Sequence, residues 1–181
     1  MQNNVQIHGR YTFIARDART GRELWRKRLE NQLMTINQII RDQMLLGTFA
    51  GPDDVLQIKY LAFGTGTTPA AASDMALETE VFRKQVTQQS YPSTGTVRTI
   101  VALTDTEANF PIKEIGVFAG PDASSTAGSG TLLSRVNVSI EKNNNIILDI
   151  IRQDVCTIDG ENPTTPPAVT QDPITGVLTI S

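Results

Sequence analysis

The first thirty positions alternate between apolar and polar residues in the way that a pair of strands does. Large apolar side chains occupy odd positions of the first stretch, as a strand with one buried face requires; they are Val5, Ile7, Tyr11 and Phe13. Residues 17–21 have the composition of a turn, in which Gly21 can take a positive φ. The chain then returns with Leu24 and Trp25 as its large apolar residues. The pattern predicts a β-hairpin over residues 5–29.

The apolar period changes after this hairpin. Four apolar side chains follow one another at intervals of three or four residues and would share one stripe of a helix; they are Leu33, Ile36, Ile40 and Met44. Asn31 can cap the start of such a helix, and Gly47 can end it. We therefore expect one α-helix over residues 32–46.

Residues 55–158 show a different pattern, in which short apolar stretches are separated by clusters of Gly, Pro, Asn and Ser. This spacing is typical of an antiparallel sandwich. The expected strands are 57–64, 80–89, 94–103, 112–119, 131–140 and 146–158. The fold class predicted from the sequence is mainly β, an antiparallel β-sandwich that could be of the jelly-roll type, with an N-terminal hairpin and one helix. We expect residues 1–158 to form this module.

The last segment, residues 159–181, reads as an extended arm. Its first fifteen residues carry four of the nine prolines and one large branched apolar side chain, Val169. A short β-rich stretch follows, for which the sandwich offers no obvious partner strand. Such a strand is suited to pairing with a sheet edge on a neighbouring molecule. We expect Val177, Leu178 and Ile180 to make that contact.

Composition and charge exclude several classes of protein. The single cysteine, Cys156, rules out a disulfide scaffold, and one cysteine with one histidine, His8, rules out a site with several Cys and His metal ligands. No apolar stretch is long enough to span a bilayer, so no membrane contact is expected. The net charge of −3 gives no reason to expect nucleic-acid binding, although it divides into +4 over residues 1–50 and −7 over the rest. We interpret the basic excess mainly as a solvated hairpin, and the alternative is a patch for an acidic partner surface or nucleic acid.

Candidate catalytic motifs are weak. The segment around Gly64 and Gly66 lacks the lysine of a phosphate loop, because no lysine follows until Lys84. His8 and Cys156 could meet only through the fold. Glu78 and Glu80 could be read as the two carboxylates of a glycosidase. Charged loop residues without a catalytic role are far more common. We therefore expect no enzymatic activity and no cofactor or metal.

Three blocks in order resemble a module of tailed-bacteriophage structural proteins. The first runs from Tyr-Leu-Ala-Phe-Gly-Thr-Gly-Thr-Thr-Pro at residues 60–69 to Asp-Met-Ala-Leu-Glu-Thr-Glu-Val-Phe-Arg at 74–83. The second is Phe-Pro-Ile-Lys-Glu-Ile-Gly-Val-Phe at 110–118, and the third is Gly-Thr-Leu-Leu-Ser-Arg-Val at 130–136. The motif residues are Gly64, Gly66, Pro69, Leu77, Glu80, Arg83, Glu114, Gly116, Phe118 and Arg135.

Physical reasoning assigns structural roles to some of these residues. Gly64 and Gly66 would let the chain reverse sharply. Glu114 lies in a strongly apolar strand, and a buried carboxylate needs a cationic partner, for which Arg83 and Arg135 are the candidates. Glu80 and Arg83 are three residues apart and would lie on opposite faces of a regular strand. A direct pair between them would require a bulge.

The resemblance implies a function in the virion. Related stretches open tail-fibre proteins of contractile-tailed phages, where the module attaches the fibre to the baseplate. No fibre shaft or receptor-binding tip follows here, which favours a tail, baseplate or collar adaptor. The alternatives are a capsid cement protein and a host-glycan-binding tail protein. Expected partners are further copies of the chain and other virion proteins, and the expected location is the virion, assembled in the cytoplasm of the bacterial host.

Overall fold

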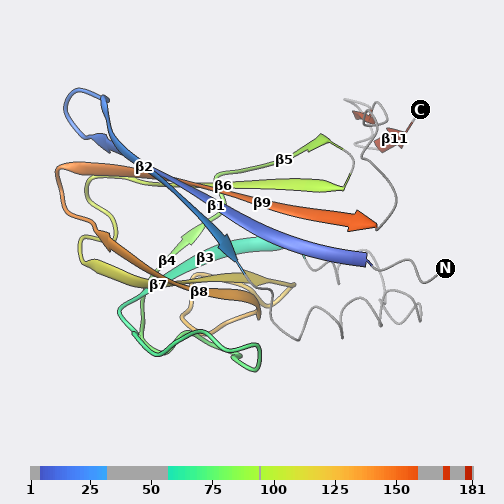
Figure 1. The fold of residues 1–181 in the computed structure, drawn as a ribbon, viewed down its shortest axis with the longest axis horizontal. Helices are drawn as coiled ribbons and strands as arrows, with labels where there is room; N and C mark the ends of the chain where they lie inside the picture. Colours follow the sequence, from blue (N-terminus) through green and yellow to red (C-terminus); the bar gives the residue numbers. More distant parts are fainter. Residues whose placement is uncertain (1–4, 32–56, 94, 159–168, 172–177, 181) are drawn as a thin grey trace.

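Two antiparallel β-sheets pack face to face in the computed structural model, which describes residues 5–31, 57–93, 95–158, 169–171 and 178–180 (Figure 1). The expected mainly β fold and its sandwich architecture are confirmed. The described residues contain no helix, and the helix expected at residues 32–46 lies outside them. The described residues accordingly include no helix that could cross a membrane.

The larger sheet, sheet A, has five strands in the order β2-β1-β9-β6-β5. Its strands are β1 (Val5–Asp17), β2 (Glu23–Asn31), β5 (Gln88–Ser93), β6 (Thr96–Leu103) and β9 (Ile146–Ile158). The smaller sheet, sheet B, has the order β4-β3-β7-β8. Its strands are β3 (Ile58–Gly64), β4 (Glu80–Gln85), β7 (Pro111–Ala119) and β8 (Thr131–Glu141).

The N-terminal hairpin forms as expected and extends two residues further than predicted, to Asn31. The Asp17 carbonyl accepts a hydrogen bond from the Gly21 amide at 2.8 Å, and Gly21 has a φ of 70°. The Asp17 carboxylate also accepts bonds from the amides of Arg19 and Thr20, at 3.1 and 2.8 Å. The side chain of Asp17 thus satisfies the turn, a common role of aspartate at such positions.

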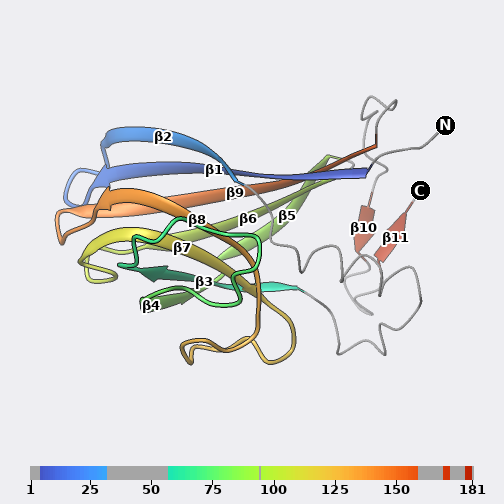
Figure 2. The same cartoon turned by 60° about the horizontal axis from the view of Figure 1, so that its bottom comes forward.

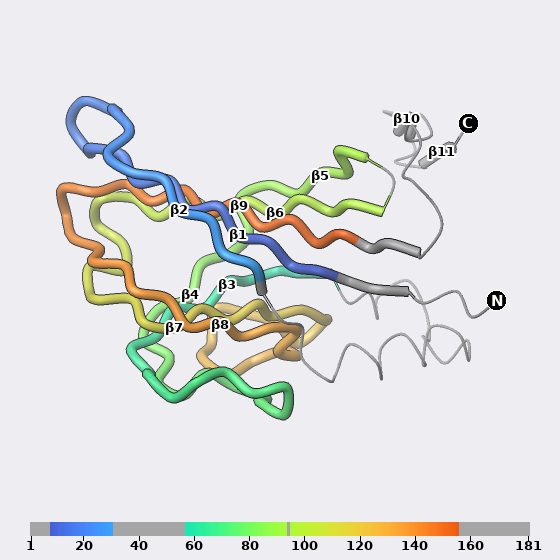
Figure 3. The backbone as a smooth tube through the Cα atoms, viewed as in Figure 1, coloured from blue at the N-terminus to red at the C-terminus, as the bar shows by residue number. Residues whose placement is uncertain are grey.

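The single strand expected at residues 80–89 is wrong, because the chain crosses there from one sheet to the other. The amide of Val86 donates to the carbonyl of Lys59 in sheet B, and that of Thr87 donates to Ile100 in sheet A. Figure 3 shows the chain passing from β4 to β5. Val86 and Thr87 are β-branched and favour extended backbone, so the sequence pattern continues across the switch without a break.

The core lies between the inner faces of the two sheets. On β1 the buried side chains at alternate positions are Tyr11, Phe13 and Ala15, as the odd-position pattern predicted for the first two. Sheet B contributes side chains such as Ile115 and Val117 from β7. These residues are fully or almost fully buried, and their removal from water is the main source of the sandwich's stability.

The C-terminal arm differs from its prediction as a plain extended segment. Strand β11 (Leu178–Ile180) pairs antiparallel with β10 (Val169–Gln171), so the last strand does find a partner within its own chain. Val169 and Thr170 are β-branched, which favours a strand where the prolines had suggested none. The two strands form a sheet of their own that is hydrogen-bonded to neither large sheet. Val177 lies outside the described residues.

A buried arginine connects the two sheets inside the sandwich. Arg152 on β9 is 1% exposed. Its Nη1 donates to the hydroxyls of Tyr11, in the same sheet, and Ser134, in sheet B, both at 2.7 Å. Its Nε donates to the carboxylate of Asp154 at 2.8 Å, which balances the charge. The guanidinium therefore has hydrogen-bond partners on three sides within the interior.

We predict that Arg152→Ala lowers the free energy of unfolding by about 3–5 kcal/mol, because it strands Asp154 and two buried hydroxyls. Urea denaturation measures this change. Arg19→Ala serves as the control, since Arg19 is exposed in the turn and its loss should cost less than about 0.5 kcal/mol. A loss below about 1 kcal/mol for Arg152→Ala would contradict the structural role given to this residue.

Candidate functional site

The loop between β3 and β4, residues 65–79, lies over the outer face of sheet B (Figure 2). Strand β7 turns Ile115 and Val117 toward the sandwich core, so its intervening residues Glu114, Gly116 and Phe118 face outward under this loop. Much of the sequence motif thus meets at one place. We call residues 65–79 the motif loop.

Glu114 is the centre of this arrangement and is fully buried. Its Oε1 accepts hydrogen bonds from the backbone amides of Gly66 and Thr79, at 3.1 and 2.7 Å. Its Oε2 accepts bonds from the amide of Glu78 at 3.0 Å and from Nε of Arg135 at 2.8 Å. One carboxylate therefore holds both ends of the motif loop against the sheet.

Arg135 is the cationic partner of Glu114 and comes from the neighbouring strand β8. It is 3% exposed and lies directly opposite Gly116 in the strand register. Its Nη1 donates to Asp74 at 2.8 Å and its Nη2 donates to the carbonyl of Thr68 at 3.0 Å. Burial opposes the charge, but the bonds to Asp74 and Glu114 outweigh burial and raise the pKa of the guanidinium above its ordinary value.

The motif glycines leave room for the loop to approach the sheet. A Cβ on Gly66 would come within 2.5 Å of the Glu114 carboxylate, and one on Gly64 would overlap the carbonyl oxygen of Thr79. A Cβ on Gly116 would meet the side chain of Leu77 at 2.9 Å. Any side chain at these positions would push the loop away from Glu114, which explains the need for glycine better than turn formation does.

Leu77 supplies the apolar part of the loop contact. It packs in a small cluster on the outer face of sheet B with Ala62, Phe118 and Leu132, and it is 8% exposed. At the rim, the side chain of Asn137 accepts a bond from the amide of Ala70 at 2.7 Å and donates to Thr68 at 3.0 Å. The loop is therefore fixed by an apolar contact as well as by Glu114 and Arg135.

Glu80 and Arg83 form a bidentate ion pair, with nitrogen–oxygen distances of 2.7 and 2.8 Å. A regular strand would have placed them on opposite faces. The register between β3 and β4 shifts after Phe63, where Gly64 pairs with Glu80. This irregularity supplies the condition under which such a pair was expected to form. Arg83 is consequently occupied by Glu80, and Arg135 alone pairs with Glu114.

Arg83 also holds a second loop, residues 120–130. Its Nη1 donates to the carbonyl of Ser129 at 2.7 Å and to that of Ser124 at 3.3 Å, while its guanidinium lies 4.0 Å from the ring centroid of Phe118. Glu80 accepts a further bond from the amide of Gly128 at 3.1 Å. This Gly/Ser-rich loop is thereby attached to sheet B by the motif's second ion pair.

Nine of the ten predicted motif residues take part in these contacts, while Pro69 is exposed in the motif loop. Leu178 and Ile180 lie apart in the two-stranded arm sheet. Sequence reasoning missed Asn137 and the roles of Asp74 and Glu78. Asp74 pairs with Arg135 and accepts a bond from the amide of Ala71. The sequence signal that could have found Asp74 and Glu78 is their Asp-x-x-x-Glu spacing within one loop that follows two glycines.

The acidic side chains of this arrangement are directed at the chain's own backbone and at arginines. Both Glu114 oxygens accept two hydrogen bonds each from the chain itself. Glu78 accepts a bond from the Thr68 amide, and Glu80 is paired with Arg83, so both carboxylates of the glycosidase hypothesis have structural partners. Among the described residues, no group of three or more His, Cys, Asp or Glu side chains could hold a metal ion.

Comparison of the chain with protein-family models, with curated proteins and with solved structures found no match. The motif geometry is therefore the basis on which its function can be argued.

We predict that Glu114→Ala lowers the free energy of unfolding by about 3–5 kcal/mol, because it leaves Arg135 and three loop amides without their acceptor. For a chain of this size, the melting temperature should fall by roughly 6–20 °C. Glu141→Ala is the matched control, since that exposed carboxylate pairs with Lys113 alone among the described residues. A melting temperature of Glu114→Ala within about 2 °C of wild type would contradict the prediction.

Acid should loosen the motif loop through Asp74. The bond from the Ala71 amide, together with the ion pair to Arg135, lowers the pKa of Asp74 below its ordinary value of 3.8. A carboxyl with a lowered folded-state pKa stabilises the protein above its unfolded pKa, and this stability is lost as the pH falls through the folded value. Urea midpoints at pH 7, 4 and 3 should therefore fall less steeply with pH for Asp74→Asn than for wild type. Equal slopes would refute this role of Asp74.

Proposed function

We propose that the protein is a non-enzymatic structural component of a tailed-phage particle. Its most specific role under this proposal is a tail, baseplate or collar adaptor that joins fibres or other tail proteins. The proposal begins from the three sequence blocks at residues 60–83, 110–118 and 130–136, which resemble a module of phage tail-fibre and baseplate proteins. It places the protein in the virion, after assembly in the bacterial cytoplasm.

The observation that carries the proposal is that the motif side chains bind the chain's own backbone and one another. Glu114 and Arg135 direct their polar atoms at backbone and at each other, and Arg83 does the same for a second loop. A motif that fixes two loops on one sheet produces a rigid surface, which an attachment module needs in order to bind partners without losing entropy on ordering. A catalytic motif would instead direct some of these groups toward an open cleft.

Exposed side chains also bear on the glycan-binding alternative. Among the residues whose side chains the structure describes, Tyr91 is the one strongly exposed aromatic, at 47%. Stacking of sugars commonly uses several aromatic faces, so this surface gives the glycan-binding alternative little support. The number of copies per particle distinguishes a tail adaptor from a capsid cement protein, because a tail has far fewer equivalent positions than a capsid.

Charge on the described surface is compatible with contacts between like subunits. Arg19, Arg22 and Arg28 on the N-terminal hairpin are exposed and form no ion pair with another described residue. The rest of the chain, residues 51–181, carries a net charge of −7. Opposite charge on separate parts of one molecule favours association of copies and steers their encounter. Further copies and other virion proteins are thus the proposed partners.

Quantitative mass spectrometry of purified phage particles from the source of the sequence tests this proposal. We predict that the protein copurifies with particles at a ratio of tens of copies or fewer per particle. Hundreds of copies would assign it to the capsid, as a cement protein. Its absence from particles, with the protein abundant in the same lysate, would overturn the virion role.

A further inference from the structure

The open side of the sandwich contains a groove between its two edge strands. Strand β2 is the edge of sheet A, β8 is the edge of sheet B, and the two are neighbours across the gap between the sheets. The groove has a volume of about 390 Å³. Its apolar lining comes from both sheets and consists of Phe13, Leu29, Val138 and Ile140. Phe13 and Ile140 are almost fully buried, whereas Leu29 and Val138 are partly exposed and can be covered by another segment.

Both strands that border the groove are edge strands of the described sheets. β2 pairs with β1 alone and β8 pairs with β7 alone, so each edge carries outward N–H and C=O groups that bond to no other described strand. Across the gap, Lys27 Nζ lies 3.5 Å from the carbonyl of Ser139. Free strand edges bind further strands through the same hydrogen bonds that build a sheet.

The rim of the groove is positively charged. Lys27 and Arg28, both exposed, line it together with the uncharged Asn137 and Ser139. Arg28 forms no ion pair with another described residue. A segment that enters this groove would therefore gain from apolar side chains on one face and acidic residues along its length.

The C-terminal arm of the chain combines two strands that carry apolar side chains with acidic residues outside those strands. Residues 159–181 contain three acidic residues, Asp159, Glu161 and Asp172, and no basic residue. Its strands β10 and β11 pair with each other and with neither large sheet. A two-stranded sheet alone is at best marginally stable in water, so addition to a larger sheet would stabilise it.

We propose that the groove between β2 and β8 binds the β10–β11 hairpin of a second copy of this chain. The inference deepens the self-association part of the proposed function and rests on it, but not on the identity of the particle. Each copy presents one groove and one hairpin, so the contact is head-to-tail. Such contacts close into rings or extend as filaments, depending on the rotation between neighbours.

Disulfide trapping between two different full-length chains tests this contact. One chain carries Val138→Cys in the groove and the other Leu178→Cys in the hairpin, both in a Cys156→Ser background. Mild oxidation of the mixture should yield a covalent heterodimer on a non-reducing gel. Val81→Cys is the matched control, because Val81 is 53% exposed on β4, the opposite edge of sheet B. It should yield at least about tenfold less heterodimer.

A chain that carries both Val138→Cys and Leu178→Cys tests the alternative occupant of the groove, which is the β10–β11 hairpin of the same chain. A fast-migrating monomer, with no heterodimer from the mixture, would show that the hairpin folds back onto its own groove and would overturn the proposal. The absence of any crosslink in folded protein, verified by circular dichroism, would overturn it as well. Because purified protein is used, these outcomes are independent of whether the chain is found in phage particles.

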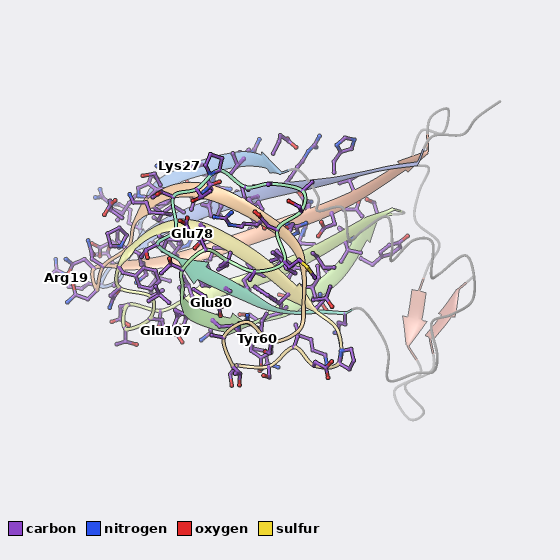
Figure 4. The ribbon with its side chains drawn as sticks, turned by 90° about the horizontal axis from the view of Figure 1, so that it is seen from below. Arg19, Lys27, Tyr60, Glu78, Glu80 and Glu107 are labelled. Atoms are coloured by element: carbon purple, nitrogen blue, oxygen red, sulfur yellow. The ribbon has the colours of Figure 1, made fainter. Side chains whose placement is uncertain are left out.

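A charge exchange in the full-length chain provides a second readout that needs no crosslink. Lys27→Glu with Arg28→Glu should weaken self-association by at least about tenfold at low salt, as measured by sedimentation equilibrium. The further substitutions Asp159→Lys, Glu161→Lys and Asp172→Lys should restore it. Arg19→Glu is the control, because Arg19 lies at the tip of the N-terminal β1–β2 hairpin, apart from Lys27 (Figure 4). Equal weakening by the control, or no restoration, would contradict binding of the acidic arm at this rim.

Discussion

The buried ion pair between Glu114 and Arg135 is the interaction on which the outer layer of the molecule depends. The pair is buried on the outer face of sheet B, because the motif loop excludes water from both side chains. The loop in turn keeps its position because the carboxylate accepts three of its amides and the guanidinium binds Thr68 and Asp74. Removal of any one component leaves a buried polar group without a partner.

The same logic recurs inside the sandwich and beneath the second loop. Arg152 links the sheets through two hydroxyls and is balanced by Asp154, while Arg83 is balanced by Glu80 and holds residues 120–130. Three arginines thus tie together segments that are distant in the sequence. By contrast, the described part of the sandwich has no comparable polar closure between β2 and β8. Its ordered loop layer and its open side are therefore different kinds of surface, the first suited to rigidity and the second to docking.

Clusters of turn residues between apolar stretches predicted most of the strands, and β9 was placed at residues 146–158 without error. The sheet switch at Val86 was not predictable, since β-branched residues suit either sheet. The need of Glu114 for a cation followed from its apolar neighbours, but two arginines fitted equally, and only the register shift at Gly64 assigned Arg83 to Glu80. Arg152 was missed because an arginine ordinarily lies in solvent, even where the alternation of its strand would point it inward.

Amide hydrogen exchange of the wild-type protein tests most directly whether Glu114 holds the motif loop. The amides of Gly66, Glu78 and Thr79 belong to a loop, and loop amides without an acceptor exchange rapidly. If the carboxylate holds them, their exchange should be slowed by at least about 100-fold relative to the unprotected rate, close to the amides of the adjoining strands. Exchange of these three amides at unprotected rates in the folded protein would contradict the account.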